Sequence, residues 1–182
     1  MKKSKVFLLA LLMGIAFSLV GCGQDSTSEE VTSDDGEAEE TAAAVEDTTL
    51  SMGEAWVVDG QWQFTIDSAE VTEERNEYEE SNPAQVIMIH YSYENLGYED
   101  SSGIWSGLYM SLDGNAQVID SNGNMCRTYP LGDVYPQETP VGAKCSAEAC
   151  YGLIAAGSPV KVIINMYDGN MDEQQATYEL TF

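Results

Sequence analysis

The segment near the C-terminus places oxygen-bearing side chains at the spacing of a calcium-binding loop. Oxygen ligands fall at positions 1, 3, 5 and 12 of such a loop, namely Asp168, Asn170, Asp172 and Glu179. In such a loop, side-chain oxygens at these positions bind the calcium ion. Position 6, which needs glycine for the sharp turn, is Glu173 instead. The segment therefore gives a candidate calcium site, with an ordinary Asp-Gly turn between two strands as the alternative. The sequence predicts no other cofactor.

The thiols form a second candidate group, because Cys126, Cys145 and Cys150 all lie in the C-terminal part of the chain. Outside the cytoplasm such thiols can oxidise to a disulfide. Because there are three of them, one cysteine would remain unpaired. Cys145 and Cys150 close the shortest loop, so a disulfide between them is predicted, with pairing of Cys126 to either one left open. A straight strand would point residues five apart to opposite faces, so this disulfide requires a bulge or turn at 146–149.

His90 is the only histidine, so any Ser-His-Asp or Cys-His arrangement must use it. It falls in the middle of an expected strand, on the face opposite Ile87 and Ile89, which is typical of a surface or packing residue. No motif of a serine hydrolase, a zinc protease or a phosphate loop occurs. Paired carboxylates for glycoside hydrolysis stay open, since their spacing cannot be read from the sequence. The sequence favours a protein that is not an enzyme.

Aromatic residues are the last candidates for chemistry. They cluster in glycine-containing, loop-like sequence and are Tyr98, Trp105, Tyr109, Tyr129 and Tyr135. Exposed aromatic side chains on loops can bind a glycan or a peptide. Packing in the core and corners of a β-protein is the alternative. Trp105 and Tyr109 are the candidate ligand-binding residues.

The N-terminus has the pattern of a secretory signal. Lys2, Lys3 and Lys5 precede an apolar run over 6–20, which is shorter than the ~20 residues needed to span a bilayer. Leu-Val-Gly directly before Cys22 resembles the lipobox of bacterial lipoproteins. This resemblance implies that residues 1–21 are removed and that a lipid on the sulfur of Cys22 tethers the protein to the outer side of the cell membrane. An ordinary secreted protein is the alternative.

Residues 22–50 are predicted to be a lipidated cysteine followed by a disordered acidic linker. This segment has no lysine, arginine or aromatic residue, and too few apolar residues to offset the entropy of ordering. All 31 acidic residues follow Cys22, against four basic ones, so the chain from Cys22 onward has a formal charge of −27. The lack of a basic stripe excludes nucleic-acid binding.

Residues 51–182 are long enough for one domain. Short apolar-polar alternation separated by turn residues predicts an all-β, antiparallel sandwich of about eight strands. The expected strands are 55–58, 61–71, 86–95, 107–112, 117–120, 125–129, 143–153, 160–167 and 176–182. A turn is expected at 120–124, and a solvated loop or strand extension, rather than a helix, at 70–80.

Four segments of this domain resemble an uncharacterised lipoprotein domain family found mostly in Gram-positive bacteria. They are Trp62-Gln-Phe-Thr-Ile66, Tyr91-Ser-Tyr-Glu-Asn-Leu-Gly97, Asp120-Ser-Asn-Gly123 and Ala156-Gly-Ser-Pro-Val160. The resemblance implies an immunoglobulin-like sandwich and an extracytoplasmic lipoprotein, and it brings no reaction or ligand. We therefore expect a non-enzymatic binding module with a protein, peptide or glycan partner at the cell surface. A calcium-binding envelope protein is the alternative, and a hydrolase is less favoured.

Overall fold

The computed structural model describes residues 49–104 and 106–182. Its elements are β1 (Thr49–Ser51), β2 (Ala55–Val58), β3 (Trp62–Thr72), β4 (Gln85–Asn95), α1 (Leu112–Asn115), β5 (Ala116–Ile119), β6 (Met125–Thr128), β7 (Lys144–Leu153), β8 (Val160–Tyr167) and β9 (Glu173–Leu180). The described part of the chain is thus all-β apart from one short helix, as predicted. No helix in this part is long and apolar enough to cross a membrane.

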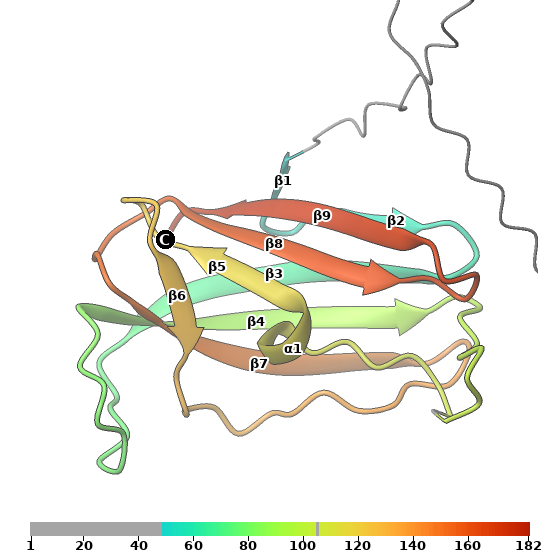
Figure 1. Cartoon of the computed structure of the whole chain (residues 1–182), viewed down its shortest axis with the longest axis horizontal. Coiled ribbons are helices and arrows are strands. Elements are labelled where there is room, and N and C mark those ends of the chain that lie inside the picture. Colours follow the sequence, from blue (N-terminus) through green and yellow to red (C-terminus); the bar gives the residue numbers. More distant parts are fainter. Residues whose placement is uncertain (1–48, 105) are drawn as a thin grey trace, which may run out of the picture. The chain divides into compact units, whose positions relative to one another are not determined.

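The strands are hydrogen-bonded in the order β1-β9-β8-β5-β6-β7-β4-β3-β2. Strand β6 connects the two halves of the sheet, because its Cys126 pairs with Val118 of β5 while its Thr128 pairs with Tyr151 of β7. The sheet folds over at β6, so β5, β8 and β9 form one layer and β3, β4 and β7 the other (Figure 1). The rings of Phe64 and Tyr178 meet between the layers, with centroids 6.1 Å apart. The result is a sandwich of two packed layers.

Period-two alternation explains which side chains fill the space between the layers. In β4 the buried residues include Ile87, Ile89, Tyr91 and Tyr93, while the alternate residues Met88, His90, Ser92 and Glu94 face outward. Strand β3 likewise buries Trp62, Phe64 and Ile66. Because successive side chains in a strand point to opposite faces, one face of each central strand is apolar. The predicted inward face of β4 is confirmed.

Two predicted segments fold differently. The residues expected to form a strand at 107–112 make only an isolated bridge between Leu108 and Thr139, and the chain then enters α1. Leu108, Met110 and Leu112 are still buried alternately, so the alternation reflects burial without a partner strand. At the other end, Thr49 and Leu50 of the predicted linker form β1 (Thr49–Ser51) together with Ser51, and β1 pairs in parallel with β9.

The turn and the loop that the sequence predicts are confirmed. Residues 120–124 reverse the chain between β5 and β6, with Gly123 at φ +83°. Strand β3 extends to Thr72, and 73–84 then form a loop without a helix.

Candidate ligand-binding groove

The predicted calcium ligands do not come together. Asp168 Oδ1 accepts the backbone N–H groups of Asn170 at 2.8 Å and Asp172 at 3.0 Å, and Oδ2 accepts the side-chain amide of Gln174. Glu179 instead pairs with Lys161, at the other end of the β8–β9 hairpin. No cluster of metal-binding side chains occurs among the residues that the structure describes. The segment is therefore an Asp-Gly turn closed by Asp168, and the calcium-loop prediction is corrected.

The predicted Cys145–Cys150 disulfide is not formed, and all three described cysteines are free. Strand β7 pairs with β4 in unbroken register from Lys144 to Leu153. At about 3.3 Å per residue, the five steps separate Cys145 from Cys150 by about 17 Å, on opposite faces. Because β7 has no bulge at 146–149, the two thiols cannot meet. Cys126 packs in the main core, whereas Cys150 belongs to a small apolar cluster with Val86 and Tyr129.

His90 lies on the outer face of β4, as expected for a surface residue. Its Nδ1 is 3.4 Å from a carboxylate oxygen of Glu148, and its Nε2 is 3.7 Å from one of Glu70. No serine or cysteine hydroxyl or thiol within the described ranges hydrogen-bonds to His90. The imidazole thus bridges two carboxylates of neighbouring strands, and this arrangement contains no nucleophile for it to activate.

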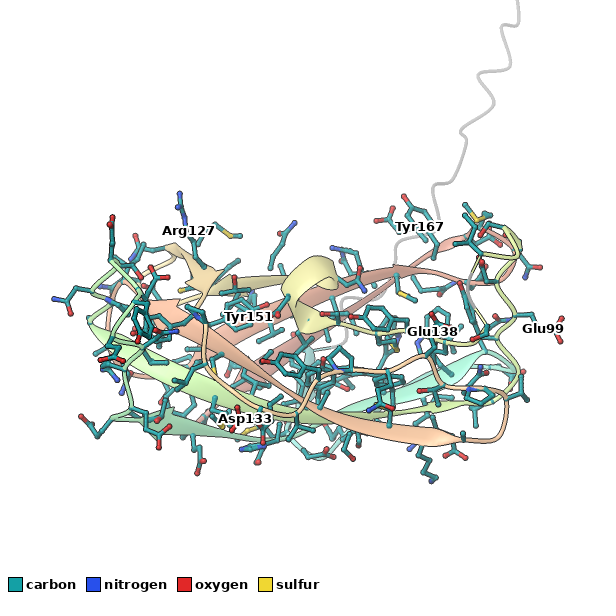
Figure 2. The ribbon with its side chains drawn as sticks, turned by 90° about the horizontal axis from the view of Figure 1, so that it is seen from below. Glu99, Arg127, Asp133, Glu138, Tyr151 and Tyr167 are labelled. Atoms are coloured by element: carbon teal, nitrogen blue, oxygen red, sulfur yellow. The ribbon has the colours of Figure 1, made fainter. Side chains whose placement is uncertain are left out.

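A groove lies where the end of α1 and the start of β5 meet the last residues of β8. It consists of a hollow of about 470 Å³ and an adjoining one of about 240 Å³, which share Tyr98, Gly114, Asn115 and Met166. We call it the tyrosine groove, and its other lining residues are Gly107, Tyr109, Ser111, Ala116, Gln117, Asn165, Tyr167 and Glu173. Figure 2 shows Tyr167 projecting outward from the upper side of the domain in that view.

Tyr98 is held in the groove by the buried side chain of Asn95 at the end of β4. The Asn95 amide N–H groups donate to the carbonyls of Thr139 at 2.9 Å and Tyr98 at 3.1 Å. Its Oδ1 accepts the backbone N–H groups of Gly97 and Tyr98 at 3.0 and 2.7 Å. The Tyr98 ring also meets Trp62 edge-on, with centroids 5.9 Å apart. Asn95 therefore stabilises the turn that positions Tyr98 in the groove.

Tyr109 is positioned by the bridge between Leu108 and Thr139. At Gly107 an added Cβ would collide with the backbone of Thr139 and Pro140, so only glycine allows this close approach. The Leu108 N–H then donates to the Thr139 carbonyl at 2.9 Å, and the reverse bond is 2.8 Å long. Tyr109, next in the chain, is 37% exposed.

The groove combines aromatic and apolar surface with amide groups. Burial, and after it the charges of Asp100 and Asp168, raise the pKa of Tyr98, so its hydroxyl stays protonated. Asn165 Oδ1 accepts from Gln175 at 2.7 Å, and the Asn115 amide makes only a 3.8 Å contact with the Met166 sulfur. Such a lining can pack against an apolar ligand face and hydrogen-bond to its polar edge.

The sequence identified part of this groove. Of the predicted ligand-binding residues, Tyr109 lies in it, and Trp105 lies outside the described residues. Tyr98 joins Tyr109, whereas Tyr129 and Tyr135 line a different hollow of about 740 Å³. Sequence reasoning missed Asn115, Met166 and the outward-facing residues of β5 and β8. Asn115 falls between two expected strands, and the β5 and β8 residues occupy ordinary strand positions, so the local sequence does not show what lies beside them.

The comparisons with known proteins concern the fold. No protein-family model and no curated protein matches the chain. Among solved structures, the yjhA protein from Bacillus subtilis is similar over 71% of this chain and 98% of its own, with 14% identity and a TM-score of 0.51. The secreted protein MPT63 from Mycobacterium tuberculosis is similar over 75% of this chain and 99% of its own, with 11% identity and a TM-score of 0.53. At these identities the likeness concerns the all-β fold.

Proposed function

We propose that this protein is a lipid-anchored, extracytoplasmic binding module, without catalytic activity, that takes its ligand in the tyrosine groove. The observation that carries the proposal is the groove itself, where tyrosines from separate segments meet amide side chains of α1, β5 and β8. Concave sites that combine apolar walls with a few polar groups are typical of ligand binding.

The location rests on other features. The pattern that ends at Cys22 supports export and lipid attachment. The similarity to a secreted mycobacterial protein is consistent with an extracytoplasmic fold. The two packed layers support an immunoglobulin-like variety of sandwich, and the acidic segment before the domain fits a spacer between the domain and the membrane.

Binding of the purified full chain to cell envelopes of the producing organism tests this proposal, with Cys22→Ser in every protein so that no lipid on Cys22 contributes to sedimentation. We expect the chain with an intact groove to sediment with envelopes, and a Tyr109→Ala/Tyr167→Ala double variant to lose most of this binding. Tyr78→Ala is the matched control, because Tyr78 is 86% exposed and lies outside the groove. Equal sedimentation of all three proteins, or of none, would overturn the proposal.

A further inference from the structure

The composition of the tyrosine groove also indicates the class of its ligand. We propose that the groove binds an uncharged oligosaccharide, whose sugar rings pack on the tyrosines and whose hydroxyls bond to the amides. This inference rests on the proposed function and adds the chemistry of the ligand to it.

Charge is the first observation. Residues 49–182 contain 21 acidic and four basic side chains, and hence have a formal charge of −17. The groove nevertheless has a single charged lining residue, Glu173, and no lysine or arginine. A phosphate, sulfate or carboxylate would therefore meet no cation and an acidic protein. The neighbouring 740 Å³ hollow, in contrast, is lined by the carboxylates of Glu79, Asp113, Asp133 and Glu148. The groove is suited to an uncharged ligand.

The amides are the second observation. Elsewhere in the domain, side-chain amides stabilise loops, as Asn95 does at Tyr98 and as Gln61 does by accepting the Gly169 N–H at 3.1 Å. In the groove, the Gln117 side chain makes no hydrogen bond to any described residue. Within 49–104 and 106–182, the amide N–H groups of Asn165 and the amide oxygen of Asn115 also make no hydrogen bond. These donors and acceptors can pair with hydroxyl groups, each of which donates one bond and accepts others.

The exposed surface of the tyrosine rings is the third observation. Tyr167 is 54% exposed, and Tyr98 and Tyr109 are partly exposed beside Met166. An aromatic face carries partial negative charge and attracts the weakly positive C–H groups that cover one side of a sugar ring. Rings and amides side by side match a ligand whose surface is C–H on one face and hydroxyl around its edge.

The strand order favours an oligosaccharide over a peptide. Extended peptides commonly bind by adding a strand to an open sheet edge. In the groove, β5 is paired on both sides, by β8 and β6. Strand β8 pairs with β5 only up to Ile164, so residues 165–167 of β8 are paired on one side alone, by β9. An open edge of three residues is shorter than the usual strand of about 5–6 residues, so side chains are the main means of recognition.

The test uses envelopes of the producing organism that have been treated with periodate, which cleaves sugars at adjacent hydroxyls, or with protease. The full chain with Cys22→Ser, which carries no lipid on that residue, should lose its binding after periodate and keep it after protease. Purified, uncharged envelope polysaccharide should then compete for binding. Tyr167→Ala and Gln117→Ala should each weaken the affinity for it about threefold to tenfold, while Tyr78→Ala should not change it. Tyr167→Phe, which keeps the ring, should retain more affinity than Tyr167→Ala.

Binding that survives periodate but is lost after protease would overturn the oligosaccharide and leave the binding function in place. The same holds for competition by anionic polysaccharide alone. Binding that no groove variant weakens would instead overturn the proposed function, so the two failures are distinguishable.

Discussion

At the scale of single residues, two buried aspartates close turns instead of binding metal. Asp120 accepts the backbone N–H groups of Asn122, Asn124 and Ala155 at 3.0, 2.9 and 2.7 Å. Burial alone would raise the pKa of Asp120, but these hydrogen bonds and the Asn124 side chain together lower it below the usual aspartate range. The ionised carboxylate of Asp120 is thus part of the folded structure. Asp168 likewise accepts backbone N–H groups, those of Asn170 and Asp172, in the β8–β9 turn.

Substitution of Asp120 should change how stability depends on pH. A lowered pKa means that the ionised group stabilises the fold above about pH 4, the usual aspartate value, and that this contribution is lost as pH falls through the folded-state pKa. Asp120→Asn should lower the free energy of unfolding by about 1–3 kcal/mol at pH 7. The difference from wild type should shrink toward pH 3 in urea titrations. A difference that stays constant across this range would contradict the role of the charge.

The cysteines should differ in reactivity and should remain unpaired. Burial, followed by the nearby charge of Glu148, raises the pKa of Cys150 to about 11, and burial also raises that of Cys126. Because the thiolate is the reactive form, maleimide at pH 7 should label partly exposed Cys145 first and the other two only after unfolding. Peptide mapping without reductant measures both properties. A peptide linked through Cys145 and Cys150 would refute the free-thiol state.

At the scale of elements, the end of β4 couples the sheet to the groove. Asn95 is fully buried and makes four hydrogen bonds that tie the turn after β4 to the segment before β7. This explains why a buried asparagine stands at the end of a strand whose other buried residues are apolar or aromatic.

Asn95→Ala should destabilise the domain strongly, because it leaves buried backbone groups without partners. We expect a loss of about 2–4 kcal/mol and a fall of about 5–15 °C in melting temperature. Exposed Asn82 makes no hydrogen bond within the described residues, so Asn82→Ala is the control and should melt like wild type. Equal melting of the two variants would show that Asn95 does not hold this turn.

The strands were predictable from the sequence because their signal is local. Alternation in 86–95 and 160–167 and the Asn-Gly turn at 120–124 each need only neighbouring residues. The groove was not predictable, because the pairing of Ala116 with Ile164 brings α1 and β5 beside the end of β8. The prediction of a Cys145–Cys150 disulfide was wrong for a related reason. The two cysteines are close along the chain, but the unbroken register of β7 keeps their thiols apart.

At the scale of the whole molecule, net charge should limit stability. With a formal charge of −17 over residues 49–182, repulsion among carboxylates opposes the compact state. Raising ionic strength from about 0.02 to about 0.5 M screens this repulsion and should raise the melting temperature. Sodium chloride and choline chloride should act alike, since screening depends on ionic strength. A melting temperature that is unchanged, or lower, at high salt would contradict this.

The proposed anchor can be tested in cells. Cys22→Ser removes the sulfur that would carry the lipid, so the variant should move from the membrane fraction to the medium. Cys145→Ser is the matched control and should stay with the membrane. Retention of the Cys22→Ser protein in the membrane would argue against a lipid on this residue.

NMR can show at single residues whether the tyrosine groove is the ligand site. Backbone amide shifts of the full chain would be recorded during titration with uncharged polysaccharide purified from the envelope. We predict saturable changes at Tyr98, Asn115 and Met166, and none at Tyr129 or Val134 in the acidic hollow. Changes confined to the acidic hollow, or no changes at saturating polysaccharide, would contradict the account.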